Sequence, residues 1–244
     1  MVNTFLFTHD FRDSAHLMDR ARLGKQRPEG KQILNNIITI RVLSSHLGID
    51  VRTVGISSAI KTIKTWIVNT AVPQGHKITL DEFGNMIDPA VTCPSATSFE
   101  VKKLGFASHP CTSMWYGYED ALKDYINCHI YEWVSRGYKN DMVTYTLTSS
   151  TYERPPWTDM PEVYNMFKCA CLYKEIIRDE KPWYQLQNEF VTAFMCANIP
   201  KIKSSKNYEH YIWPSIFDES WRSQMLNMYP CIRSMNILTE LSQT

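Results

Sequence analysis

The sequence predicts a mainly α protein, with a compact helical domain, a long irregular insertion and a C-terminal extension of helical and irregular segments. Three observations support this prediction. Apolar side chains recur at helical spacing in several long segments, residues 76–108 show almost no period, and two consecutive prolines precede a further helical pattern. We therefore expect a helical domain over 1–149 with an insertion at about 48–108. An extension over 150–244 should pack on the same core.

Helix signals divide the first part of the chain. Asp10 is suited to cap a first helix, Gly24 is typical of a helix end, and Pro28 is typical of a helix start. The helix that Pro28 begins should run to about Leu47, and it is apolar on more than one side, which indicates burial. A third helix is expected over 57–71.

Beyond the third helix, the irregular stretch should contain a short hairpin around 83–85. One long helix is expected from Pro110 to Gly137, and shorter helices over 161–178 and 190–197. The C-terminal residues are aromatic and irregular, and we expect them to wrap around the body of the protein.

Composition excludes several classes of protein. The formal net charge is +1, so the chain does not coat nucleic acid by charge alone. Its seven cysteines form no CxxC pair, which favours a reducing compartment and buried thiols over a disulfide framework or a metal site. A signal peptide is not evident, and no run approaches the ~20 apolar residues of a membrane span. We expect a cytoplasmic protein with neither metal nor cofactor.

One cationic segment stands out in this nearly neutral chain. It contains Arg20, Arg22, Lys25, Arg27 and Lys31 against the single acid Glu29. If one helix ends at Gly24 and the next begins at Pro28, the residues between them form a turn beside a helix N-terminus. Backbone N–H groups, the helix dipole and the cations would then favour an anion such as a nucleic-acid phosphate. The alternative is a solvated basic turn between two packed helices.

Several motifs resemble one enzyme family. N-T-F-L at 3–6, L-M-D-R-A-R-L-G-K-Q-R-P-E at 17–29, H-P at 109–110 and M-W-Y-G-Y-E at 114–119 are similar to the pyrimidine-dimer DNA glycosylases of endonuclease V type, in their bacterial and phage branch. The resemblance covers roughly the first 140 residues outside the insertion. More weakly, K-P-W-Y at 181–184 resembles the aromatic C-terminal segment that the phage enzyme places against DNA.

The resemblance implies a compact helical fold and an enzyme that catalyses both the glycosylase and the abasic-site lyase reactions. The nucleophile in the phage enzyme is the α-amino group of the mature N-terminus, which here would belong to Val2. Arg22 aligns with the family pattern, but the position of the family's glutamate falls on Leu23. Glu29 is the nearby carboxylate that can substitute for it. An α-amino group titrates near ~8 and a lysine near ~10.4, so Lys25 is the second candidate amine.

An ionised Glu29 would stabilise a cationic sugar or iminium transition state; the alternative is a structural carboxylate paired with Lys25 or Arg27.

The expected DNA substrate is double-stranded, with one nucleotide turned out of the stack. The expected nucleic-acid-binding residues are His16, Arg20, Gln26, Arg27, Lys31, His109, Trp115, Tyr118, Trp183 and Tyr184. The histidines and Trp115 have a structural alternative, since lone histidines and aromatic stripes are commonly part of a core.

Three functions remain open at this point. The first is a DNA glycosylase, with or without lyase activity, for a damaged or modified base. The second is a base-modifying or nucleoside-processing enzyme that leaves the strand intact. The third is a non-catalytic protein that binds nucleic acid or nucleotides.

Overall fold

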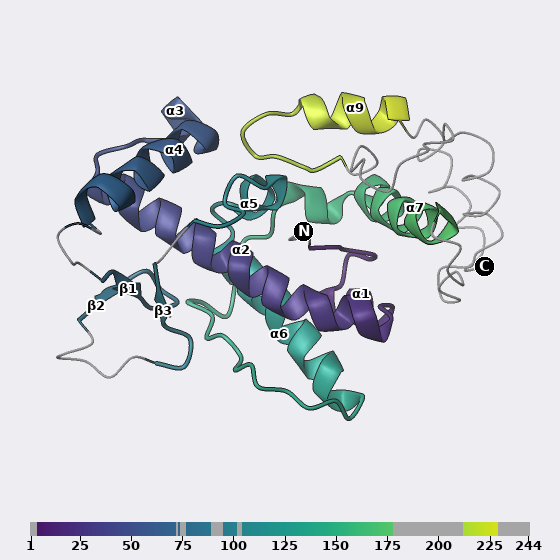
Figure 1. Ribbon diagram of the computed structural model, residues 1–244. Coiled ribbons are helices and arrows are strands. Elements are labelled where there is room, and N and C mark those ends of the chain that lie inside the picture. Colours follow the sequence, from purple (N-terminus) through teal and green to yellow (C-terminus); the bar gives the residue numbers. More distant parts are fainter. Residues whose placement is uncertain are drawn as a thin grey trace.

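Helices make up most of the structure, so the predicted fold class is confirmed. A computed structural model describes residues 4–71, 73, 77–88, 95–101, 104–177 and 212–228. The long helix α2 (Arg20–His46) is the central element, and α6 (Glu119–Ser135) packs across it (Figure 1). None of the described helices is long and apolar enough to cross a membrane.

Helix α2 is uninterrupted, so the predicted break between Gly24 and Pro28 is wrong. Asp19 caps the helix by accepting a hydrogen bond from the N–H of Arg22 (2.8 Å). Gly24 faces α6, where an added Cβ would lie 3.1 Å from the Trp133 ring. Pro28 has no N–H to donate to the Gly24 carbonyl oxygen four residues earlier. Because Pro28 is exposed, water can reach that oxygen instead. The glycine permits close helix packing, and the proline is tolerated on the solvent side.

The first helix is short and is fixed at both ends. In α1 (Phe11–His16), the Asp10 carboxylate accepts hydrogen bonds from the N–H groups of residues 12 and 13 at 2.7 and 3.0 Å, which confirms the predicted cap. At the other end, Arg136 from the end of α6 donates to the carbonyl oxygens of His16 and Met18, both at 2.7 Å. This guanidinium satisfies carbonyl groups that a helix end leaves without partners.

The single long helix expected from Pro110 to Gly137 is in fact two helices. Helix α5 (Pro110–Trp115) ends before Gly117, which has φ 85°, and α6 begins at Glu119. A positive φ of this size favours glycine and cannot continue a right-handed helix. The break changes the direction of the chain, so that α5 and α6 both pack against α2.

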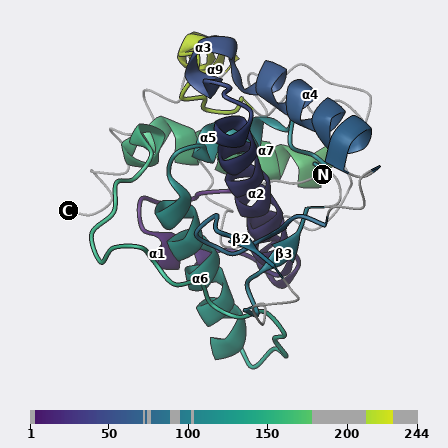
Figure 2. The same ribbon diagram turned by 90° about the vertical axis from the view of Figure 1, so that its left-hand side faces the viewer.

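The insertion is more regular than expected. Its helical part consists of α3 (Val51–Val54), α4 (Ile56–Trp66) and the short π-helical turn η1 (Ile67–Ala71). Its second part forms a small antiparallel sheet in the order β2-β1-β3, with β1 (Thr79–Leu80), β2 (Met86–Ile87) and β3 (Phe99–Glu100). The predicted hairpin around 83–85 is confirmed. Figure 2 shows α3 and α4 on one side of α2 and the sheet on the other.

The C-terminal part of the chain shares the main core. It includes the 3-10 turn η2 (Pro156–Asp159), α7 (Pro161–Ile177) and α9 (Ser220–Met228), with α7 and α9 on the side of α2 where α5 lies (Figure 1). Trp157, Phe167 and Trp221 belong to the same buried cluster as Trp115. Residues 220–228 are helical, contrary to the irregular structure expected there, whereas the helix expected over 190–197 lies outside the described residues.

Candidate active site

Thr4 and Phe5, the first residues that the structure describes, are held by buried hydrogen bonds from three helices. The N–H of Phe5 donates to Oε1 of Gln26 on α2 (2.9 Å). The Tyr125 hydroxyl on α6 lies 2.7 Å from the same oxygen and 2.9 Å from the Phe5 carbonyl oxygen. Nε1 of Trp115 on α5 donates to the Thr4 hydroxyl (2.7 Å). Residues 4 and 5 are therefore fixed where α2, α5 and α6 meet.

Glu29 acts electrostatically on the residues around this junction. The pKa of Cys111 is raised to about 12, chiefly by burial; hydrogen bonds from Thr4 oppose this shift, and the negative charge of Glu29 contributes to it. Burial and the same charge also raise the pKa of Tyr125 well above its ordinary value. Cys111 and Tyr125 are both bonded to the first described residues, so the Glu29 carboxylate lies within electrostatic reach of the start of the chain.

A row of polar side chains runs along one side of α2. Arg22, Lys25 and Glu29 are separated by three and four residues, and this spacing places them next to one another on a helix. Lys25 is exposed, whereas Arg22 and Glu29 are half-buried. Arg22 forms an ion pair with the Asp19 carboxylate. A guanidinium, an ammonium and a carboxylate are thus presented beside the anchored start of the chain.

The other cations of the motif lie on a different side of α2. Arg20, Arg27 and Lys31 follow each other at spacings of seven and four, so they share a face that is rotated away from Lys25. The Arg20 guanidinium lies 4.9 Å from the Tyr138 ring centroid. The single anion pocket expected in a turn is therefore replaced by two separate basic edges, since a continuous helix distributes these residues around its axis.

Arg27 has a packing role. Its guanidinium carbon lies 4.1 Å above the Trp133 ring, and Nη1 donates to Oδ1 of Asn140 (2.7 Å). Only 8% of the residue is exposed, and this burial lowers the pKa of its guanidinium. Arg27 thus joins α2 to the end of α6 and to the segment that follows it.

Gln26 and Trp115 do not reach a nucleic-acid surface, and their expected DNA-binding roles are corrected here. Both side chains are buried, with 1% and 0% exposure. Their polar atoms bind residues 4 and 5, as described above, so stacking or base contact would require the core to open. Each positions the start of the chain instead.

His16, His109 and Tyr118 occupy three different environments. His16 is exposed, and its Nδ1 lies 3.1 Å from the Glu132 carboxylate. His109 caps α5, accepting a hydrogen bond from the N–H of Cys111 at Nδ1 (3.2 Å), and burial lowers its pKa. Tyr118 immediately precedes α6, and burial raises the pKa of its phenol. Val2, Trp183 and Tyr184 lie outside the described residues.

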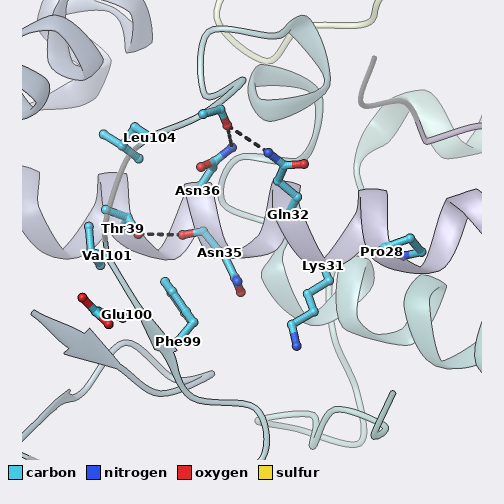
Figure 3. A pocket seen from close by; sticks show the side chains of 11 residues that line it. Pro28, Lys31, Gln32, Asn35, Asn36, Thr39, Phe99, Glu100, Val101 and Leu104 are labelled. Carbon is cyan, nitrogen blue, oxygen red and sulfur yellow. Dashed lines mark hydrogen bonds between the residues drawn. The ribbon is translucent and has the colours of Figure 1, made fainter. Parts of the chain in front are cut away.

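A cavity of about 320 Å³ opens between α2 and the β3 segment. Figure 3 shows Lys31 and Asn35 extending from α2 toward Phe99 and Glu100 across this space. Ammonium and amide groups of α2 and the Phe99 ring and Glu100 of the β3 segment thus line the cavity. Its edge near residue 105 is tied to α2 by the hydrogen bonds drawn in Figure 3.

Two functional candidates were not identified from the sequence. Arg136 caps the C-terminal end of α1 through its guanidinium. In the sequence, this role is indicated only by an arginine that precedes a glycine at a helix end. Phe106 is an exposed aromatic residue in a turn docked on α2, within the stretch G-F-A-S-H-P that shows no period. Both placements depend on partners far away in sequence: Arg136 contacts the end of α1, and the turn that holds Phe106 is bonded to α2.

The fold and the site define a mostly helical protein in which a carboxylate and basic side chains share one side of the central helix, near the anchored residues Thr4 and Phe5. Residues 2–146 match the family model described as pyrimidine dimer DNA glycosylase, so the chain belongs to this family. Membership supports DNA glycosylase activity in general, with DNA as the binding partner. A comparison with curated proteins gave no match, and neither did one with solved structures.

Proposed function

We propose that this protein is a DNA glycosylase with abasic-site lyase activity, which removes a damaged or modified base from double-stranded DNA through an amine nucleophile assisted by Glu29. One observation carries the proposal. Thr4 and Phe5 are anchored by buried side chains of three helices, next to the side of α2 that presents Arg22, Lys25 and Glu29.

Chain geometry makes the N-terminal amine a suitable nucleophile. If Met1 is removed, the α-amino group belongs to Val2, two residues before Thr4. An extended chain spans at most ~3.6 Å per residue, so this amine lies within about 7 Å of a residue that is fixed in the junction. Its ordinary pKa near ~8 leaves a useful neutral fraction at neutral pH. These points support an amine that works close to Glu29.

The proposed reaction proceeds through a covalent imine. The neutral amine attacks C1′ of the extrahelical nucleotide, and the base leaves with the bonding electrons and is protonated from water. A proton passes from nitrogen to the ring oxygen O4′ as the C1′–O4′ bond breaks, and the opened sugar carries an iminium between the amine and C1′. Removal of a C2′ proton then expels the 3′ phosphate, and water releases the enzyme. Glu29 stabilises the positive charge near C1′, and Arg22 holds a neighbouring phosphate.

Lys25 is the alternative amine. It projects from the same side of α2 as Glu29, but it is exposed to solvent. An ordinary lysine titrates near ~10.4 and is almost entirely protonated at neutral pH. The two amines are distinguished by which peptide carries the trapped DNA.

Borohydride trapping tests the proposal, because it reduces the iminium to a stable amine. The substrates are duplexes that contain ultraviolet photoproducts, oxidised or alkylated bases, or an abasic site. We expect a trapped adduct with the native N-terminus and with Lys25→Met. No adduct should form when one extra residue precedes Val2 in the mature protein. If wild-type protein gives no trapped adduct with any of these substrates, including the abasic site, the lyase mechanism is refuted.

One observation favours a second candidate function. Leu23, where the resemblance places the family's glutamate, is fully buried in the core. A protein that lacks a carboxylate at that position is also compatible with DNA binding without base removal, or with modification of a base in an intact strand. Mass analysis of the reacted duplex separates the possibilities, because excision leaves an abasic sugar, modification changes the base mass, and binding alone changes neither.

A further inference from the structure

Phe106 combines two features that are unfavourable for a folded protein in water. Its φ is 58°, in the left-handed region that bulky residues avoid. It is also 58% exposed, so its ring is not compensated by burial in the core. Among the described residues, it is the sole non-glycine with a positive φ. Strain of this kind persists where the surroundings impose it, and it is concentrated at functional positions.

The surrounding turn is firmly held. The Gly105 carbonyl oxygen accepts hydrogen bonds from Nε2 of Gln32 (3.2 Å) and Nδ2 of Asn36 (3.0 Å), both on α2 (Figure 3). On the other side, the Phe106 carbonyl oxygen accepts a hydrogen bond from the N–H of His109, which caps α5. Two helices therefore fix the backbone on both sides of the exposed ring.

The turn is docked on the side of α2 that presents the candidate catalytic groups. Gln32 follows Glu29 by three residues and Lys25 by seven, and Asn36 follows Glu29 by seven, so these side chains form one row along the helix. The Phe106 turn thus lies about one to two helical turns from Glu29. A duplex positioned over Lys25 and Glu29 would pass within reach of this ring.

We propose that Phe106 is a DNA-contacting wedge, whose ring stacks on a nucleobase and occupies the gap left when the target nucleotide is turned out. This inference rests on the proposed function. A wedge must be aromatic or apolar, exposed before DNA binds, and rigid enough to enter the base stack. Exposure, the imposed backbone conformation and the two anchored flanks supply these properties.

The test uses a duplex that carries a tetrahydrofuran abasic-site analogue, with 2-aminopurine as the base opposite it. Fluorescence of 2-aminopurine reports how that base is stacked, and titration gives the Kd. The variants are Phe106→Gly, which suits the positive φ and removes the ring, and Phe106→Trp, which restores a stacking surface. Tyr131→Ala is the matched control, because Tyr131 is an aromatic residue of similar exposure (56%) that lies on α6.

We expect Phe106→Gly to weaken binding to the analogue duplex about ten-fold, which corresponds to about 1.4 kcal/mol, and to abolish the fluorescence change. The same variant should unfold at a higher temperature than wild type, since glycine relieves the strained φ. Phe106→Trp should recover most of the affinity, and Tyr131→Ala should match wild type. Higher stability with lower affinity is a combination that a merely structural residue would not give.

The proposal is overturned if Phe106→Gly binds the analogue duplex and changes its fluorescence as wild type does. It is also overturned if Tyr131→Ala is equally impaired, because the effect would then not be specific to this turn. Borohydride trapping with wild-type protein tests the proposed function separately. A Phe106-dependent fluorescence change without any trapping would retain the wedge and refute the lyase reaction.

Discussion

Replacement of Gln26 by leucine tests whether the buried hydrogen bonds at the start of the chain serve catalysis. Oε1 of Gln26 accepts from the N–H of Phe5 (2.9 Å) and from the Tyr125 hydroxyl (2.7 Å). Leucine nearly preserves the volume of the side chain but removes this acceptor. The tyrosine hydroxyl still has the Phe5 carbonyl oxygen at 2.9 Å, whereas the buried hydrogen bond from the N–H of Phe5 to Gln26 is lost.

The expected loss of stability follows from removing the buried acceptor. Loss of such an acceptor costs about 1–3 kcal/mol, and in a protein of this size each kcal/mol lowers the unfolding midpoint by roughly 2–4 °C. The Gln26→Leu variant should therefore remain folded at 25 °C. Its trapped adduct should nevertheless fall about ten-fold or more, because a nucleophile displaced by about 1 Å loses much of its reactivity.

Thr39→Val is the matched control on the same helix. Thr39 is buried and its hydroxyl donates to the carbonyl oxygen of Asn35 within α2 (2.7 Å), far along the helix from Gln26. Both variants are compared by thermal unfolding and by borohydride trapping on an abasic-site duplex. If trapping by Gln26→Leu declines only in proportion to the unfolded fraction, as expected for Thr39→Val, the positioning role is refuted.

Three further predictions follow from the site and its supports. Glu29→Gln should lower the rate of base excision at least about 100-fold with little change in DNA affinity, and an unchanged rate would exclude a catalytic carboxylate there. Arg27→Lys should lose the stack on Trp133 and the bond to Asn140, reducing the unfolding free energy by about 1–2 kcal/mol in urea titrations. Burial lowers the pKa of His129 to about 4, so the unfolded chain binds a proton below about pH 6.5 before the folded chain does. Stability should fall by about 3 kcal/mol from about pH 6.5 to 4, and His129→Gln should flatten that profile.

Local signals predicted those elements whose partners lie nearby in sequence. The Asp10 cap, the hairpin around 83–85 and the helix beginning at Pro161 each depend on a few adjacent residues, and each is present. The break at Gly117 was missed because the aromatic residues around it suit a continuous helix. Its positive φ becomes evident only from the backbone.

The cationic motif shows why local signals misplaced the candidate site. A glycine is suited both to a helix end and to a close approach between helices, and Gly24 takes the second role against Trp133. Which role applies depends on α6, about a hundred residues away in sequence. Once α2 is continuous, the cations divide between two edges, and Gln26, expected to bind DNA, turns toward the core.

The motif therefore places packing residues and the proposed catalytic residues on adjacent sides of one helix. Gly30 is packed so tightly against α6 that an added Cβ would lie 2.8 Å from Ile126, and within 3.9 Å of Tyr125. Any larger residue at position 30 would push α6 away and carry with it the hydroxyl that bonds to Phe5 and Gln26. The position of Thr4 and Phe5 relative to Glu29 thus depends on Gly30, which has no side chain. The proposed site therefore requires glycine at positions 24 and 30, where α2 packs against α6, as well as the charged residues between them.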